Sequence, residues 1–228
     1  PATRVLILSS SFPRFSGDHS GIFVLELARK LRGKGWDIAA IAPQDATAPV
    51  SEVIDNIKIR RFRYFVPRTR QMLAYGDGVS ANMQNNLLSV IQIPFFFVAE
   101  LFATIRMATK EKVDVLNSQW LAPQGFVGAL CRRITGIPHI ATIHSSEITL
   151  LKRMPAGRWI AEFTLMNSDA IVSVSNHRAH ELSTFVRKSV WETVEDRITV
   201  LPMGVSAANL RDRGEKDELR ARYRVTSR

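Results

Sequence analysis

Apolar runs alternate with amphipathic patterns along the chain. Runs of Val, Ile, Leu and Ala predict strands at residues 4–9, 36–43, 57–65, 113–119, 138–144, 170–175 and 198–204. Apolar residues at helical spacing predict helices at residues 22–35, 87–110, 122–135, 157–168 and 177–188. Strands that alternate with helices and are bounded by Gly or Pro indicate βαβ units. We therefore expect an α/β fold with a doubly wound, mainly parallel sheet.

The longest apolar run covers residues 90–105 and contains Gln92, Pro94 and Glu100. A membrane-spanning helix needs about 20 apolar residues with few or no charges. This run is shorter and carries a charge, so it predicts a buried or interfacial helix instead.

The composition narrows the class of protein. The chain has 228 residues, of which 46% are hydrophobic, and this is enough to form a folded core. A single cysteine, Cys131, and an N-terminus that runs straight into a strand pattern favour a reducing, cytoplasmic compartment. The net charge of +10 favours anionic partners such as nucleotides, phospholipid surfaces or nucleic acid, or is simply a solvated surface. No helix-turn-helix or aromatic RNA-binding signature accompanies the charge, so we do not expect a nucleic-acid partner.

Polar residues and glycines follow the predicted strands, at the edge where open α/β sheets bind ligands. The first such loop, residues 9–21, is long and contains Gly17 and Gly21, which would let the backbone approach a ligand closely. Ser20 is a candidate N-cap for the helix that follows, and a helix N-terminus can bind an anion. A glycine-capped turn without a ligand is the alternative explanation for the same spacing.

His144 ends one of the predicted strands, and Glu147 follows three residues later. A histidine in this position can donate to a sugar hydroxyl or to a developing charge, or it can be a hydrogen-bonded structural residue. Glu147 is placed either to cap the next helix or to contact a substrate. The five His residues have no metal-ligand spacing, and no nucleophilic triad can be assembled. We expect no metal site.

Basic residues gather between residues 58 and 70, without an acidic residue among them. Their alternation with apolar residues predicts a strand with one solvated basic face. The alternative is a surface for anionic lipid headgroups or a phosphorylated acceptor, formed by Lys58, Arg60, Arg61 and Arg63.

Five ordered blocks of the sequence resemble the N-terminal domain of the retaining, family 4 glycosyltransferases of GT-B fold. The first resembles F-P-x-x-x-G-x-x-x-G-x-F, with Phe12, Pro13, Gly17, Gly21 and Phe23. The second, "NSQWLAPQG", resembles H-x-H-W-x-x-P-x-G, although Asn117 and Gln119 stand at the usual His positions. The others are "HSSE" for H-G-S-D, the segment "SDAIVSVSN", and "PMGVS" for P-N-G-V-D. The segment "LAYGDG", residues 73–78, looks like members that act on lipid-linked or polysaccharide acceptors.

The resemblance implies a Rossmann-like domain that forms one half of a two-domain enzyme. Such an enzyme transfers a sugar from a nucleoside diphosphate sugar to a glycan or lipid-linked acceptor, with retention and without a metal cofactor. It places Gly21 by the donor pyrophosphate and His144 by the transferred sugar. It also implies donor contacts at Gly17, Ser175 and Gly204, and substrate contacts at Gln119, Trp120, Ser146 and Glu147.

The same resemblance implies a division of the chain. Residues 1–206 would form the Rossmann-like domain, and the charged tail 207–228 would lead toward a C-terminal nucleotide-binding domain with a Glu-x7-Glu pair. The chain alone would then be inactive, and the enzyme would be cytoplasmic or peripheral on the inner face of the membrane. The alternative is a non-catalytic module that binds an acceptor or a membrane.

Overall fold

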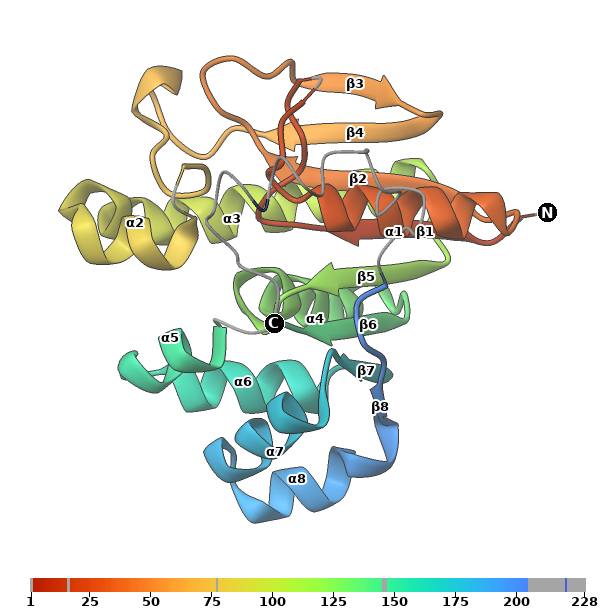
Figure 1. Cartoon of the computed structure of the whole chain (residues 1–228), viewed down its shortest axis with the longest axis vertical. Coiled ribbons are helices and arrows are strands. Elements are labelled where there is room, and N and C mark those ends of the chain that lie inside the picture. Colours follow the sequence, from red (N-terminus) through yellow and green to blue (C-terminus); the bar gives the residue numbers. More distant parts are fainter. Residues whose placement is uncertain (1, 16, 77, 145–146, 205–219, 221–228) are drawn as a thin grey trace.

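The computed structural model describes residues 2–15, 17–76, 78–144, 147–204 and 220 (Figure 1). Its centre is a sheet of eight strands in the order β3-β4-β2-β1-β5-β6-β7-β8. The strands are β1 (Arg4–Leu8), β2 (Asp37–Pro43), β3 (Ser51–Ile54), β4 (Ile57–Phe62), β5 (Val115–Gln119), β6 (His139–Ile143), β7 (Ala170–Ser173) and β8 (Ile198–Val200).

The helices join these strands. They are α1 (Ile22–Gly33), α2 (Val79–Asn85), α3 (Leu87–Lys110), α4 (Phe126–Thr135), α5 (Glu147–Arg153), α6 (Gly157–Met166), α7 (Asn176–Phe185) and α8 (Lys188–Val194). Short helical turns lie at Arg68–Arg70, Leu121–Gly125 and Glu195–Arg197.

The sheet is parallel except at one edge, as the strand–helix alternation predicts. β1 pairs with β2 on one side and with β5 on the other, both in parallel. Only the β3–β4 pair among the described strands is antiparallel. The chain leaves β1 toward β2 and later returns to β5 on the opposite side, so the order of the strands reverses between β1 and β5. Ligands of doubly wound sheets bind at such a switch point.

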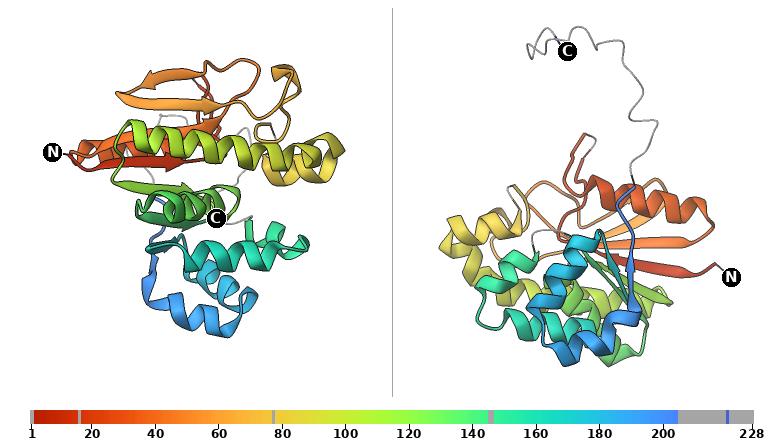
Figure 2. Two further views of the ribbon diagram at one scale, coloured as in Figure 1. Left: turned by 180° about the vertical axis from the view of Figure 1, so that it is seen from behind. Right: turned by 60° about the horizontal axis from the view of Figure 1, so that its bottom comes forward.

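Helices cover both faces of the sheet, which confirms the doubly wound, Rossmann-like fold. On one face, α1 packs through Val24, Leu25 and Ala28 against β1, β2 and β4. On the other face, α3 and α4 pack against the opposite side chains of the same strands, among them Leu6, Leu8, Ile41 and Leu116. Figure 2 shows α3 lying across this second face when the molecule is viewed from behind. Both sets of strand residues are buried because each strand is covered on two sides.

Several elements differ from the sequence prediction. β3, α2, α5 and α8 were not predicted, and the expected helix 177–188 is α7, which ends at Phe185. The predicted strand 198–204 ends at Val200. Apart from Arg220, the tail 207–228 lies outside the described residues, so the division into a domain and a tail stays a prediction.

The apolar run 90–105 lies within α3, a helix of 24 residues. One face of α3 is buried against the sheet and carries Gln92, Phe96, Glu100, Thr104 and Ala108. By length and composition α3 could cross a membrane, but its buried face holds polar side chains with partners in the protein. Gln92 Nε2 donates to the carbonyl of Arg70 (2.7 Å), and Gln124 Nε2 donates to Glu100 Oε1 (3.1 Å).

Candidate functional site

A cavity of about 460 Å³ lies at the carboxyl edge of the sheet, beside the switch point between β1 and β5. Its lining comes from the segments that follow three parallel strands and from the region before and within α2. The lining residues include Ser10, Ser11, Ser20, Tyr75, Gly76, Gly78, Trp120, Ala122, Pro123 and Glu147. A volume of this size suits a sugar-sized ligand, since small-molecule sites occupy about 300–1,000 Å³.

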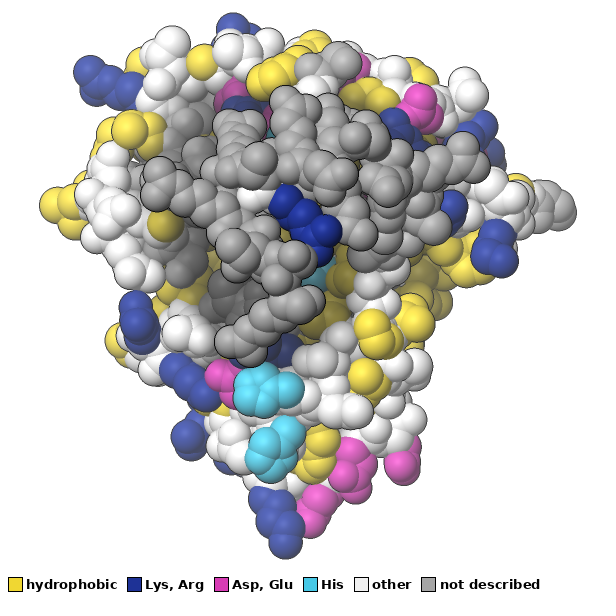
Figure 3. All heavy atoms as spheres, in the orientation of Figure 1, with side chains coloured by type: hydrophobic (Ala, Val, Ile, Leu, Met, Phe, Trp, Pro, Cys, Tyr) yellow, Lys and Arg dark blue, Asp and Glu magenta, His cyan; other side chains and the backbone are white. Residues whose placement is uncertain are grey.

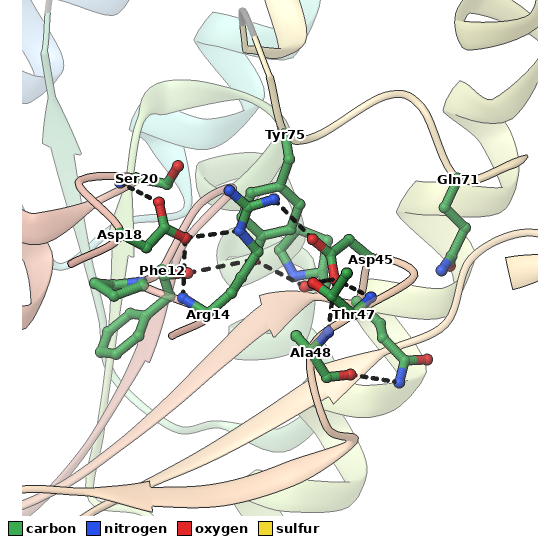
Figure 4. A network of polar contacts seen from close by, with 12 residues as sticks. Phe12, Arg14, Asp18, Ser20, Asp45, Thr47, Ala48, Gln71 and Tyr75 are labelled. Atoms are coloured by element: carbon green, nitrogen blue, oxygen red, sulfur yellow. Dashed lines mark hydrogen bonds and ion pairs between the residues drawn. The ribbon is translucent and has the colours of Figure 1, made fainter. Parts of the chain in front are cut away.

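The first loop is held in place by a polar network (Figure 4). Asp18 Oδ2 accepts from the backbone N–H of Arg14 (3.0 Å) and from its Nε (2.7 Å), and Asp18 Oδ1 accepts from the N–H of Ser20 (3.0 Å). Arg14 also pairs with Asp45 (2.7 Å) and lies over the ring of Tyr75, 4.3 Å from its centroid. Burial opposes ionisation of Asp18, but the hydrogen bonds from Arg14 and Ser20 prevail and lower the pKa of its carboxyl. The long first loop is thus fixed by internal hydrogen bonds and forms one wall of the cavity, through Ser10, Ser11 and Ser20.

Arg61, on β4, fixes the same loop from the sheet. Its guanidinium is fully buried, pairs with Glu52 Oε1 (2.6 Å) and donates to the carbonyl of Pro13 (2.6 Å) and to Tyr75 Oη (3.0 Å). The expectation that Arg61 belongs to a membrane-facing surface is therefore wrong, because its side chain is buried and is paired with Glu52 on the neighbouring strand β3. Lys58, on the other hand, is exposed and pairs with Glu111 (2.9 Å), and Arg60 and Arg63 are exposed.

Gly21 begins α1, and its backbone is left-handed with φ of 67°. A Cβ at Gly21 would lie 2.2 Å from the carbonyl oxygen of Ser11. The absence of a side chain at Gly21 therefore lets the backbone of the helix start pack closely against the backbone at Ser11. The N-cap of α1 is Gly21, so the expected capping by Ser20 is wrong, and the N–H of Ser20 is instead bound by Asp18.

His144 lies directly behind the cavity wall. Its ring contacts those of Phe23 and Trp120, each with centroids 5.2 Å away, and only 7% of the residue is exposed. Its Nε2 is 3.0 Å from Gln119 Oε1, while the Gln119 amide nitrogen donates to Asn117. In this arrangement the Gln119 oxygen can only accept, so Nε2 carries the proton and Nδ1 keeps a lone pair. Burial lowers the pKa of His144 to about 4, so the ring is neutral at pH 7.

Glu147 opens α5 and faces the cavity. Its Oε1 accepts from the backbone N–H of His144 (2.5 Å), which ties the start of α5 to the end of β6, and the expected capping of the helix stays a prediction. Its Oε2 is buried and has no hydrogen-bond partner within the described part of the chain. Burial is the main cause of a raised pKa at this carboxyl. A buried oxygen without a partner is costly, and a ligand hydroxyl would satisfy it.

Trp120 lines the cavity with a backbone φ of 74°, which is uncommon for a bulky residue. Among the expected site residues, Trp120 and Glu147 line the cavity, and Gln119 and His144 lie immediately behind them. Ser146 lies outside the described residues.

The remaining expected residues lie on the same edge but not in the cavity lining. Gly17 has open space around it, with no atom within 4 Å of an added Cβ. Ser175 caps α7 by accepting from the N–H of Arg178 (3.3 Å). Ser175 and Gly204 follow β7 and β8, which stand two and three strands beyond β5.

The structure also identifies site residues that the sequence reasoning did not name. Ser10, Ser11, Tyr75 and Pro123 all line the cavity. Tyr75 lies within the segment 73–78, whose resemblance to acceptor-binding members of the family was the available signal. Groups of three or more His, Cys, Asp or Glu side chains with metal-binding geometry do not occur among the described residues.

Together the fold and the cavity define a Rossmann-like domain whose ligand site lies at the switch point of a parallel sheet. The model of the family named Glycosyltransferase Family 4 matches residues 20–209. The chain therefore belongs to that family, and the resemblance drawn from its sequence motifs is confirmed.

Two curated proteins are similar to this chain in sequence. An uncharacterised glycosyltransferase of Methanocaldococcus jannaschii is 33% identical over 105 residues, which are 46% of this chain and 28% of that protein. N-acetyl-alpha-D-glucosaminyl L-malate synthase of Bacillus anthracis is 24% identical over 120 residues, 50% of this chain and 32% of the relative. The matched region thus spans about a third of these relatives.

Solved structures share the fold at low sequence identity. Anabaena HepE, solved in complex with UDP and glucose, has a TM-score of 0.59 at 12% identity, covering 98% of this chain and 50% of HepE. An alpha,alpha-trehalose-phosphate synthase from Burkholderia vietnamiensis has a TM-score of 0.57 at 12% identity, covering 97% of this chain and 55% of the synthase. This chain spans about half of each of these proteins.

Proposed function

We propose that this chain is the acceptor-side half of an enzyme that transfers a sugar from a nucleoside diphosphate sugar to a glycan or lipid-linked acceptor, with retention. The observation that carries the proposal is the cavity at the switch point of the sheet, which Trp120 and Glu147 line. The family supports glycosyl transfer, and the structures of HepE with UDP and with UDP-glucose support a sugar nucleotide as donor.

The donor phosphates would lie at the first loop and the N-terminus of α1. The loop between Gly17 and Gly21 is fixed by the bonds of Asp18 with Arg14 and Ser20, so its backbone shape is set before the donor arrives. Fixed N–H groups at a helix N-terminus stabilise the charge that develops on a departing phosphate. We propose that the reaction needs no metal cofactor, and that Ser175 and Gly204 contact the donor from the same edge of the sheet.

His144 would orient the transferred sugar through its Nδ1 lone pair. Because the Nε2 proton is committed to Gln119, the ring can accept from a sugar hydroxyl but has no free N–H to donate. A pKa of about 4 also excludes the ring as a general acid at neutral pH. Its role is therefore the placement of the sugar, supported by contacts with the Phe23 and Trp120 rings, which also contact each other.

The acceptor would occupy the cavity. Tyr75, Gly76 and Gly78 form one wall, and Glu147 faces them from α5. An acceptor hydroxyl that hydrogen-bonds Glu147 Oε2 would satisfy the unpartnered oxygen and be held in place for attack on the sugar.

A donor screen tests this proposal. The protein, expressed with whatever sequence follows residue 228 in its gene, is incubated with a panel of nucleoside diphosphate sugars and glycan or glycolipid acceptors. We expect release of the nucleoside diphosphate with one donor, and a product with the anomeric configuration of that donor. Binding of donor or acceptor without turnover would instead favour the non-catalytic module, and an inverted product would contradict retention.

A further inference from the structure

The outward face of α3 carries a continuous apolar stripe. Five large side chains on it are more than half exposed: Leu87, Ile91, Phe95, Val98 and Phe102. Their spacings of four, four, three and four residues place them on one side of the helix, opposite the buried Gln92, Phe96, Glu100 and Thr104. At 1.5 Å per residue the stripe is about 22 Å long. Figure 2 shows that no other described ribbon crosses α3 on this side.

Basic residues flank this stripe. A groove of about 660 Å³ between α3 and the β3–β4 hairpin is lined by Arg60, Arg63, Phe102, Arg106 and Lys110, so apolar and cationic side chains share one surface. Its two acidic residues, Glu52 and Glu111, are paired with Arg61 and Lys58. Arg60, Arg106 and Lys110 form no ion pair within the described part of the chain. On the opposite face, the side chains visible around the edge of the molecule in Figure 3 mix Lys and Arg with acidic and apolar ones.

These features suit a helix that lies in the plane of a membrane rather than one that crosses it. Crossing would expose Gln92 and Glu100 to lipid and remove the bonds to Arg70 and Gln124. Interfacial helices bury one apolar face about 5–10 Å into the headgroup region and carry Lys and Arg at the polar boundary. The face of α3 that would be polar and solvated in an isolated interfacial helix is instead packed against the rest of the protein.

We propose that the α3 stripe and its flanking cations dock the protein on a lipid surface that contains anionic headgroups. The apolar side chains enter the interface, and Arg60, Arg63, Arg106 and Lys110 meet the headgroups. α2, which lines the cavity, ends two residues before Leu87, so the acceptor cavity opens beside the docked helix. The proposal stands on the α3 surface and does not depend on the transfer reaction.

Vesicle sedimentation of the full chain tests the proposal. Vesicles of phosphatidylcholine alone are compared with vesicles that also contain phosphatidylglycerol. We expect binding to the anionic vesicles at low salt, about tenfold or more above binding to the neutral ones, and a loss of binding in high salt as screening increases. Equal binding to both vesicles, or none at low salt, would overturn the proposal.

Matched variants separate the two parts of the surface. Phe95→Ser with Phe102→Ser, and separately Arg63→Glu with Arg106→Glu, should each lower binding to anionic vesicles at least about tenfold. One control is Leu201→Ser, which changes an exposed apolar residue that follows β8, at the edge of the sheet farthest from β3. The other is Lys30→Glu with Lys34→Glu at the C-terminal end of α1, which packs on the other face of the sheet from α3. The controls should bind like wild type.

Two results would contradict the docking of α3. One is wild-type binding by the Phe95 and Phe102 variant, which would show that the apolar stripe is not embedded. The other is a wild-type protein that binds no vesicles and forms a dimer in sedimentation velocity, while the Phe95 and Phe102 variant is a monomer. That result would show that a second copy of the chain covers the stripe.

Discussion

Gly21 is the residue at which the first loop comes closest to the strand end that precedes it. A Cβ here would meet the Ser11 carbonyl at 2.2 Å, and the left-handed backbone adds strain for any other residue. We expect Gly21→Ala to lower the free energy of unfolding by at least about 2 kcal/mol, measured by urea denaturation.

Gly33→Ala is the matched control, since a Cβ at Gly33 meets no atom within 4 Å. It should leave the free energy of unfolding within about 1 kcal/mol of wild type. A Gly21→Ala variant as stable as the control, with weaker donor binding, would show that the glycine serves the ligand and not the fold.

Arg61 is the second residue on which the first loop depends. Arg61→Met would leave Glu52 and the carbonyls of Phe12 and Pro13 without their partner. Breaking a buried pair in this way costs about 3–5 kcal/mol, so thermal and urea unfolding should shift strongly. Arg60→Met, one residue earlier and exposed, should change the stability by about 0.5 kcal/mol or less. Equal effects of the two substitutions would contradict the anchoring role.

At the scale of elements, Glu100 on α3 is bonded to Gln124 in the turn Leu121–Gly125 that precedes α4, and burial raises the pKa of its carboxyl to about 8. Between the ordinary pKa of a glutamate, about 4.3, and this value, the folded state keeps a proton that the unfolded state releases. Stability contributed by this group is therefore present at low pH and is lost as the pH rises toward 8. The loss amounts to as much as about 1.4 kcal/mol per pH unit within that window.

Glu100→Gln removes the titration and keeps a side chain that can bond Gln124. We expect the variant to lose less stability than wild type between pH 5 and about 8, measured by urea unfolding at both pH values. Parallel losses in the two proteins would show that Glu100 is ionised in the folded state.

Prediction from the sequence succeeded for elements whose pattern is long or fully apolar. β1 (RVLIL) and β2 (DIAAIAP) are covered on both faces and are almost continuously apolar, and α3 has a long amphipathic pattern. β3 is short and half-exposed, so its pattern is weak, although the left-handed Asp55-Asn56 pair is a hairpin signal. Missing β3 also led to the error at Arg61, because its partner Glu52 lies on that strand.

The candidate site was predicted only where a residue follows a strand directly. Trp120, His144 and Glu147 were found in this way, and Gln119 through the family motif that contains Trp120. Tyr75 comes from a loop far from any predicted parallel strand, and only the tertiary contacts with Arg14 and Arg61 bring it to the cavity. The exposed stripe of α3 needed the structure, because the sequence does not show which face of a helix is covered.

At the scale of the whole molecule, we propose that the acceptor binds in the cavity between the first loop and α5. Glu147→Gln keeps the size of the side chain but weakens its bond to a substrate hydroxyl. We expect the KM for the acceptor to rise roughly tenfold, with the KM for the donor unchanged. A change confined to the donor KM would place the acceptor elsewhere.

The turnover of His144→Ala tests the central claim, that this edge of the sheet orients a transferred sugar, most directly. The variant is compared with wild type at saturating donor and acceptor, after its melting curve confirms that it is folded. The account predicts a fall in kcat of about 100-fold, because the sugar loses the group that positions it for attack. A folded variant with wild-type turnover would contradict the account and leave His144 as a structural residue.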